Sequence, residues 1–90
     1  MRLDIFLTKS RLVKQRSLAK AACDRGIVFV DGHHAKAGKE VSAGQEITID
    51  FTSRVVEVEI LRIPQGNVSR KEAGELYRIL REMRKEEEIL

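Results

Sequence analysis

The sequence predicts an α+β fold in which two N-terminal helices pack on a small, mainly antiparallel sheet and a further helix follows at the C-terminus. Apolar residues recur at helical spacing near the N-terminus, alternate with polar residues over 46–63, and return to helical spacing after residue 69. The chain has 90 residues, of which 42% are hydrophobic. That length and composition suit one domain with one modest core.

The two N-terminal helices are predicted from apolar spacing and from a stop signal. Leu3, Phe6 and Leu7 lie at positions i, i+3 and i+4, as in a short amphipathic helix. A second helix is expected over residues 16–25, because Gly26 just beyond it is a good terminating residue. Its apolar face would be formed by Leu18, Ala19, Ala22 and Cys23.

The sheet is predicted to begin with a hairpin. Residues 27–30 form a continuous β-branched and aromatic run, and Asp31-Gly32 after it is a strong two-residue turn signal. The returning strand is expected at residues 35–37. Residues 46–51 and 54–63 both alternate in polarity, which predicts an antiparallel pair joined by a short turn.

The C-terminal helix is predicted from its capping signal. Ser69 and Glu72 have the spacing of a capping box, and Ser17 is the corresponding N-cap candidate for the second helix. Five apolar residues then follow at helical spacing: Ala73, Leu76, Tyr77, Leu80 and Met83. Residues 64–90 are therefore expected to form a helix that packs on a unit made by residues 1–63, within one globular domain.

The charge of the chain is distributed unevenly. The formal net charge is +3, but residues 1–39 carry nine basic and three acidic side chains, whereas residues 40–90 carry eight basic and eleven acidic ones. A basic N-terminal half predicts a polyanionic partner at that end of the molecule. The mixed signs of the second half are typical of a solvated surface.

Composition also excludes several classes of function. Cys23 is the only cysteine, so no internal disulfide can form, and with no apolar run longer than residues 27–30 the sequence predicts a cytoplasmic protein with no membrane partner. Cys23 is expected on an apolar helix face, where a thiol is usually inert. His33 and His34 would point to opposite sides of a strand. We therefore predict no enzymatic activity, no metal site and no cofactor.

Basic residues near the N-terminus form the candidate site. Arg16 and Lys20 share one helix face, while Arg11 and Lys14 project from the preceding turn and Arg2 lies on the polar side of the first helix. Folding the two helices together would make a phosphate-binding surface. The sequence interleaves no aromatic residue among these bases, which favours contact with structured RNA over a single-strand stacking platform. A membrane-surface helix is disfavoured, because its apolar residues are needed in the core.

Over about residues 1–50 the chain resembles the S4 (ribosomal protein S4 type) RNA-binding domain family. The matching positions are Arg2-Leu3-Asp4 with Phe6-Leu7, Ser10-Arg11-Leu12, Lys14-x-Arg16-Ser17-x-Ala19, Gly26-x-Val28-x-Val30-Asp31-Gly32 and Lys36-Ala37-Gly38. The resemblance implies an S4-like domain over residues 1–63. It implies that Arg2 and Arg16 are the leading RNA contacts, supported by Lys9, Arg11, Lys14 and Lys20.

Within this family the chain resembles a group of short ribosome-quality-control factors and, more distantly, the fifteen-kilodalton heat-shock proteins. This implies a factor that binds large ribosomal subunit rRNA and peptidyl-tRNA, and supports C-terminal alanine tailing of the stalled chain by an RqcH-like tailing factor. It would be a monomer away from the ribosome. Three alternatives remain: a heat-shock-type recycling factor for obstructed large subunits, an RNA-targeting module of a modifying enzyme, and a protein–protein adaptor.

Overall fold

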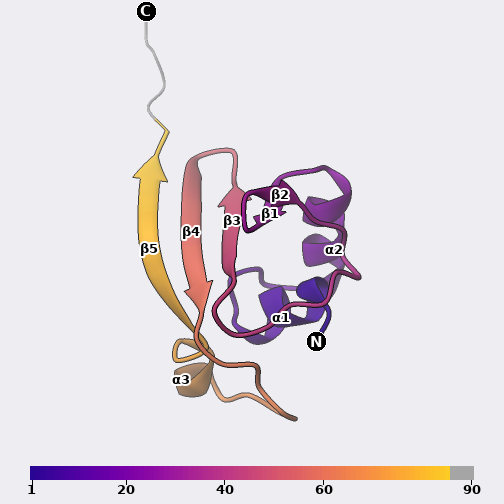
Figure 1. Ribbon diagram of the computed structural model, residues 1–90, viewed down its shortest axis with the longest axis vertical. Coiled ribbons are helices and arrows are strands. Elements are labelled where there is room, and N and C mark those ends of the chain that lie inside the picture. Colours follow the sequence, from indigo (N-terminus) through magenta and orange to yellow (C-terminus); the bar gives the residue numbers. More distant parts are fainter. Residues whose placement is uncertain (86–90) are drawn as a thin grey trace, which may run out of the picture.

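The computed structural model describes residues 1–85 and has the expected α+β architecture (Figure 1). Five strands form one antiparallel sheet in the order β2-β1-β3-β4-β5. The elements in chain order are α1 (Leu3–Lys9), α2 (Arg16–Asp24), β1 (Val28–Val30), β2 (His33–His34), β3 (Glu46–Asp50), β4 (Arg54–Ile60), α3 (Arg70–Ala73) and β5 (Tyr77–Arg84).

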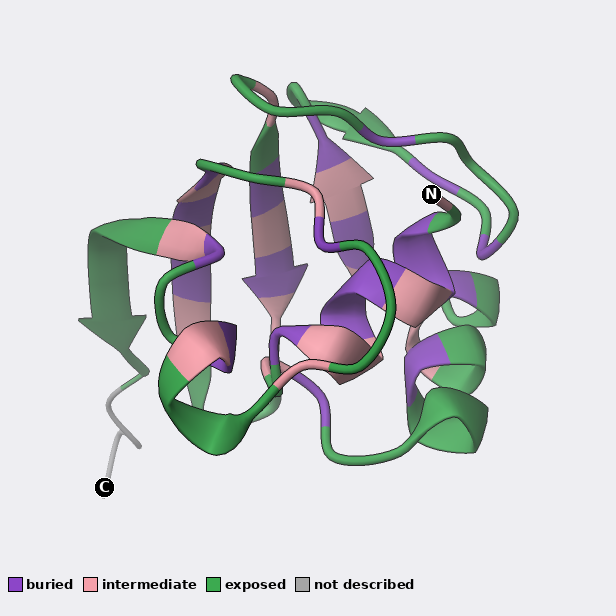
Figure 2. Ribbon diagram, turned by 90° about the horizontal axis from the view of Figure 1, so that it is seen from below, coloured by how far each residue is buried: buried purple, intermediate pink, exposed green. Residues whose placement is uncertain are grey.

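The helices α1 and α2 cover one face of the sheet and share a core with it (Figure 2). Inward-facing residues of β3 and β4 alternate with partly exposed ones along each strand, as the sequence predicts. The largest side chains that are fully enclosed in this core come from α1 and the sheet, namely Leu3, Phe6, Leu7, Val28, Ile47, Ile49, Val58 and Ile60, with Leu76 from the segment before β5.

The β1–β2 hairpin turns at the predicted dipeptide. Asp31 and Gly32 have φ angles of 49° and 84°, which is the combination that a tight two-residue hairpin turn requires. Because this turn pairs Val30 directly with His33, the returning strand is His33–His34 and not residues 35–37 as predicted. Ala35 and Ala37 are buried in the core instead.

The second helix differs from its prediction in two details. Gln15 occupies the N-cap position in place of Ser17, and its side chain makes no capping hydrogen bond. Leu18 points away from the core and is exposed, while Ala19 and Cys23 are buried. Small side chains therefore bring α2 close to its neighbours, and Gly26, with a φ of 75°, ends the segment as expected.

The predicted C-terminal helix is wrong beyond its first turn. Ser69 does accept a hydrogen bond from the backbone N–H of Glu72, but the helix α3 ends at Ala73. Residues 77–84 then form β5, which pairs antiparallel with β4 from Arg54↔Arg84 to Ile60↔Tyr77. Residues 86–90, where the end of the predicted helix falls, lie outside the described part of the chain.

A β-bulge explains why β5 resembles a helix in sequence. Ile79 lies opposite Val58 and Arg81 lies opposite Glu57, so Leu80 is the extra residue. This insertion breaks the two-residue alternation and leaves apolar residues at intervals of three and four. Pairing with β5 satisfies the backbone groups of β4, which would otherwise form the sheet edge. That tertiary gain overrides the local helical pattern.

The N-terminus is held by a loop that returns from the hairpin. The backbone N–H groups of Leu3 and Asp4 donate to the carbonyls of Lys39 and Ala37, at 2.8 and 3.1 Å. The N–H of Val41 donates to the carbonyl of Met1, and the Met1 ammonium pairs with Glu40 at 2.8 Å. These hydrogen bonds therefore hold the backbone around Arg2, the residue that precedes α1. Within residues 1–85, none of the helices has the length and apolar character that crossing a bilayer requires.

Candidate nucleic-acid interface

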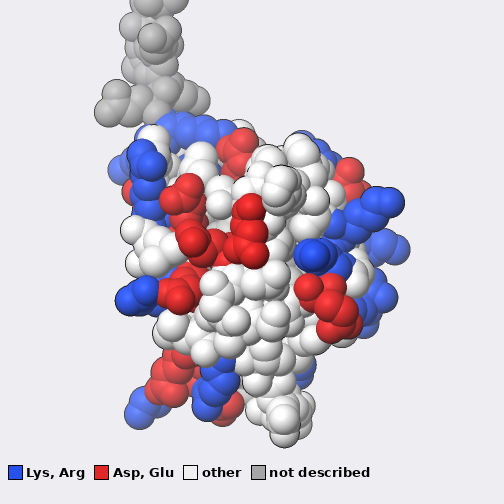
Figure 3. Space-filling view, viewed as in Figure 1, with Lys and Arg blue, Asp and Glu red and all other residues white. Residues whose placement is uncertain are grey.

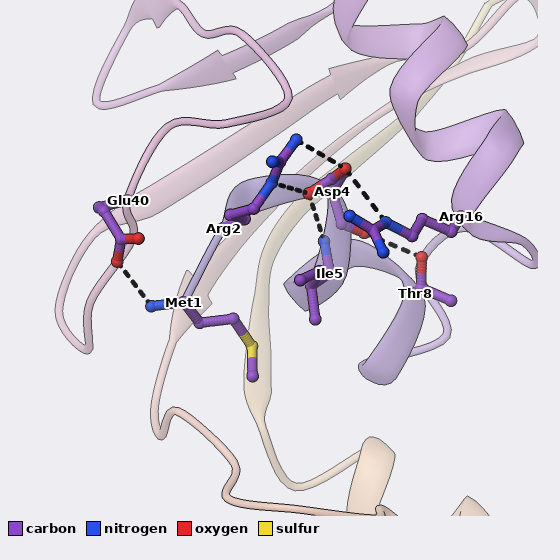
Figure 4. Close-up of polar contacts among 7 residues, drawn as sticks. All are labelled: Met1, Arg2, Asp4, Ile5, Thr8, Arg16 and Glu40. Carbon is purple, nitrogen blue, oxygen red and sulfur yellow. Dashed lines mark hydrogen bonds and ion pairs between the residues drawn. The ribbon is translucent and has the colours of Figure 1, made fainter.

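Two arginines of the candidate site meet at one buried carboxylate (Figure 4). Asp4 is 1% exposed, and its Oδ1 and Oδ2 accept hydrogen bonds from Arg2 Nε and Nη2 at 3.1 and 3.3 Å. Arg16 Nε donates to Oδ2 at 3.4 Å, and the backbone N–H of Ile5 donates to Oδ1 at 2.9 Å. We call Arg2 and Arg16, joined through Asp4, the arginine pair.

The charge of Asp4 is maintained by its partners. Burial by itself would raise the pKa of this carboxyl group, since desolvation disfavours the charged form. The hydrogen bonds and positive charge of Arg2, the hydrogen bond from Arg16 and the N–H of Ile5 outweigh it, so the pKa of Asp4 lies below its ordinary value. Asp4 is therefore ionised at neutral pH.

The arginine pair keeps most of its hydrogen-bonding capacity for a ligand. A guanidinium group has five N–H donors, of which Asp4 uses two from Arg2 and one from Arg16. The two side chains remain 45% and 60% exposed. One carboxylate thus orients two guanidinium groups and leaves the group of three with a net positive charge. Such planar, pre-oriented donors suit phosphate recognition.

Three further predicted residues gather at the opposite end of α1. Lys9, Arg11 and Lys14 line one surface hollow of about 430 Å³ together with Thr8, Asn67 and Val68. Lys9 Nζ donates to the carbonyl of Gly66 at 2.8 Å, so this end of α1 contacts the loop before α3. Among residues 1–85, no carboxylate pairs with any of the three. We call Lys9, Arg11 and Lys14 the basic cluster.

The position of the basic cluster depends on an unusual backbone conformation. Arg11 has a φ of 61°, in the left-handed region that residues other than glycine rarely adopt. Its N–H donates to the carbonyl of Thr8, and the N–H of Val13 donates to that of Leu7, so α1 ends in a sharp reversal. The buried hydroxyl of Ser10, which donates to the Leu7 carbonyl at 3.2 Å, supports the reversal. This turn directs the chain into α2.

Lys20 completes the set of six predicted residues. It is exposed one turn after Arg16 on α2, where basic side chains gather on the molecular surface (Figure 3). Acidic side chains gather instead over β3 and β4 in the same view. On the sheet, basic side chains of β4 and β5 pair with acidic ones, as Arg54 does with Glu82 and Arg78 with Glu59.

Asp4 is the residue that sequence reasoning did not assign to the site. It is the only acidic residue among the first twenty, and that isolation is the signal that could have found it. The loop of residues 36–39 also lies beside the arginine pair, since a Cβ built on Gly38 would be 3.9 Å from Arg2 Cζ. Lys36 and Lys39 in this loop line a hollow together with His33 and His34.

The groups considered for catalysis are not arranged for it. Cys23 is buried, and desolvation, together with the charges of Asp4 and Asp24, raises the pKa of its thiol to about 11. The thiolate is therefore scarce at neutral pH. The ring of His34 stacks on Phe29 with centroids 4.4 Å apart. Within residues 1–85, no group of three or more His, Cys, Asp or Glu side chains is placed to hold a metal ion.

Comparison with known proteins gives relatives that match nearly the whole chain. The chain is 46% identical over 89 residues to the RQC P-site tRNA stabilizing factor of Halalkalibacterium halodurans, covering 99% of this chain and 96% of that protein. It is 40% identical over 82 residues to the protein of the same name from Bacillus subtilis, covering 91% and 94%. These names describe a stabilizing factor and no reaction, in agreement with the predicted absence of enzymatic activity.

A solved structure and a family model agree with these relatives. The trimeric structure of Vibrio cholerae heat shock protein 15 superposes with a TM-score of 0.79 at 34% identity, covering 88% of this chain and 80% of that one. The model of the S4 domain matches residues 1–47, which include α1, α2 and the whole arginine pair. The chain belongs to the S4 domain family and, within it, to the group formed by the RQC P-site tRNA stabilizing factors.

Proposed function

We propose that this protein binds large ribosomal subunits that still carry peptidyl-tRNA, and that it holds rRNA and tRNA together through phosphate contacts. The observation that carries the proposal is the arginine pair, because a buried carboxylate orients two exposed guanidinium groups toward solvent. The basic cluster and Lys20 add positive charge on α1, on α2 and on the turn between them. The names of the relatives support tRNA as one of the two RNA partners.

The mechanism is binding without bond chemistry. Charge-assisted hydrogen bonds from Arg2 and Arg16 fix the register of an RNA backbone, while Lys9, Arg11, Lys14 and Lys20 contribute mainly salt-dependent attraction. Because backbone hydrogen bonds and the shared core hold α1, α2 and the loop of residues 37–41 together, two RNA segments bound to this surface keep a fixed relative position. A partner enzyme in the cytoplasm would use this fixed relative position of the two RNA segments.

Co-sedimentation with purified large subunits tests the proposal. The wild type is expected to bind subunits loaded with peptidyl-tRNA more tightly than empty subunits, and Arg2→Ala/Arg16→Ala is expected to lose that binding. Arg62→Ala/Arg78→Ala is the matched control, because it removes the same charge from exposed side chains that pair with Glu72 and Glu59. Equal loss of binding in both double variants would contradict the assigned surface.

More specifically, we propose that the protein supports C-terminal alanine tailing together with an RqcH-like tailing factor. In a reconstituted reaction on peptidyl-tRNA-loaded subunits, the wild type is expected to lengthen the alanine tail and the arginine-pair variant is not. The alternative role that the family resemblance implies is the recycling of obstructed large subunits, and a heat shock protein 15 shares the fold of this chain. Release of the tRNA without tailing, upon addition of this protein, would identify that role.

The proposed active form away from the ribosome is a monomer. The structure of the Vibrio cholerae relative is described as trimeric, so the oligomeric state requires a direct measurement. Sedimentation equilibrium is expected to give the mass of one chain, 10.3 kDa.

A further inference from the structure

A groove on the helix side of the β4–β5 ribbon is not used by the function proposed above. Two neighbouring hollows, of about 210 and 600 Å³, share Phe51, Arg54 and Glu82 and so form one groove. Figure 1 shows that β5 lies at the edge of the sheet away from α2, which leaves this side of the ribbon uncovered. We define the β4–β5 groove by six of its lining residues: Arg11, Phe51, Arg54, Tyr77, Ile79 and Arg84.

The walls of the groove combine flat apolar surface with positive charge. Tyr77 and Phe51 are half-buried against the core, and Ile79 beside them is 54% exposed. The Arg54 guanidinium lies over the Phe51 ring, 5.2 Å from its centroid, and adds a further planar surface. Aromatic rings and arginine planes are the surfaces on which unpaired nucleic-acid bases stack.

The charge of the groove favours an anionic ligand over a neutral or basic protein segment, and the flat stacking surfaces favour a nucleic acid among anionic ligands. Glu82, the acidic residue of the lining, is already paired with Arg54 at 2.9 Å. Within residues 1–85, Arg11 and Arg84 form no ion pair. Three arginines with one neutralised carboxylate complement a polyanion.

The groove is also continuous with the basic cluster. Arg11 lines both the groove and the hollow that contains Lys9 and Lys14. If the phosphates of an RNA strand bind along the basic cluster, the nucleotide that follows them therefore lies at the groove. The sequence hides this relation, because Arg11, Phe51 and Tyr77 come from three segments far apart in the chain.

We infer that the β4–β5 groove binds an unpaired nucleotide of the RNA, with its base against Tyr77 and Ile79 and its phosphate near Arg11. The inference rests on the proposed function, since the basic cluster must bind RNA first. It adds recognition of a single-stranded or flipped-out nucleotide to binding by charge and shape. Because the chain has one tyrosine and no tryptophan, tyrosine emission reports on Tyr77 alone.

The test compares a synthetic RNA hairpin that ends blunt with the same hairpin carrying a short single-stranded extension. The wild type is expected to bind the extended RNA on the order of tenfold more tightly. Its tyrosine emission, corrected for absorption by RNA, should fall only with the extended RNA. Tyr77→Leu and Ile79→Ser should lose the tenfold gain and still bind the blunt hairpin. Leu80→Ser is the matched control, because Leu80 is 42% exposed on the same strand but lines neither hollow.

The outcomes separate this inference from the proposed function. Suppose that binding of the blunt hairpin still depends on Arg2 and Arg16. Equal affinity of the wild type for both RNAs, or tyrosine emission that does not change at saturation, then overturns the assignment of the groove and leaves the proposed function intact. Loss of the gain in Leu80→Ser as well as in Ile79→Ser overturns it too. Blunt-hairpin binding that is indifferent to Arg2→Ala/Arg16→Ala contradicts the proposed function and removes the basis of the inference.

Discussion

The arginine pair and the basic cluster lie at the two ends of α1, and they are built in opposite ways. Arg2 and Arg16 are oriented by a buried carboxylate. Folding therefore already costs much of the side-chain conformational entropy that RNA binding would otherwise cost. Lys9, Arg11 and Lys14 pair with no acid within residues 1–85, and a backbone turn brings them together. The first arrangement suits a specific phosphate geometry, whereas the second supplies charge that tolerates different ones.

The largest expected effect comes from removing the carboxylate. Asp4→Asn keeps the shape of the side chain but loses the charged hydrogen bonds to both arginines, so we expect unfolding in urea to require about 2 kcal/mol less free energy. We also expect a clear loss of affinity for peptidyl-tRNA-loaded subunits. Retention of wild-type stability and binding would show that the arginines orient themselves without Asp4.

The pH dependence of that difference follows from the lowered pKa of Asp4. A carboxyl group whose pKa is lower in the folded than in the unfolded protein stabilises the fold above its unfolded pKa, about 3.9 for aspartate. The stability gap between wild type and Asp4→Asn should therefore be constant from neutral pH down to about pH 4. It should close as the pH falls through the lower folded value. Urea titrations of both proteins at several pH values measure it.

Replacement of single cations should separate geometry from charge. Arg16→Lys keeps the charge but removes the Nε donor that contacts Asp4, and we expect RNA affinity to fall on the order of tenfold. Lys14→Arg is the matched exchange in the basic cluster and should change affinity by less than about twofold. Filter binding over a salt series measures both. Equal effects of the two exchanges would remove the distinction between the two regions.

A substitution in the turn should act on stability and binding in opposite directions. Arg11→Gly relieves the left-handed backbone conformation, and we expect a gain of about 1 kcal/mol in unfolding free energy. The same change removes one cation, so the slope of log affinity against log salt should fall by roughly 0.7–0.9. A loss of stability would instead mean that the Arg11 side chain supports the turn.

The smallest effect is expected at Lys9. Its hydrogen bond to the Gly66 carbonyl is exposed, so Lys9→Ala should change unfolding free energy by less than about 0.5 kcal/mol. RNA affinity should fall about twofold from the lost charge. Thermal unfolding and filter binding on one preparation check both expectations. A larger loss of stability would show that this contact, and not the core, holds α1 to the loop before α3.

Elements fixed by local patterns were predictable from the sequence, and those fixed by distant contacts were not. Leu3, Phe6 and Leu7 identify α1 by their spacing, and Asp31-Gly32 locates the hairpin through its φ requirements. The isolation of Asp4 among the first twenty residues is visible in the sequence, but its contact with Arg16 depends on the packing of α2 against α1. Likewise, the bulge at Leu80 conceals a strand that only its pairing with β4 reveals.

The same distinction between local patterns and distant contacts applies to the candidate site. The sequence predicts a gathering of basic side chains near the N-terminal helices, because the first twenty residues hold six bases and one acid, and the resemblance to the S4 domain singles out Arg2 and Arg16 as expected RNA contacts. Their division into an anchored pair and a looser cluster could not be predicted, since it arises from one carboxylate and one positive φ angle. The contacts between these residues and RNA remain predictions for the experiments above.

The bulge in β5 has a further consequence for self-association. An eight-residue strand at the edge of a sheet presents backbone donors and acceptors to which a second chain could add, the first step of aggregation. Here the extra residue at Leu80 disturbs the strand's regular hydrogen-bonding pattern, and three arginines against the single Glu82 give the strand a net positive charge. Two such edges would repel each other and fail to align. The bulge that makes this strand resemble a helix in sequence therefore also disfavours pairing of β5 with β5 of a second molecule.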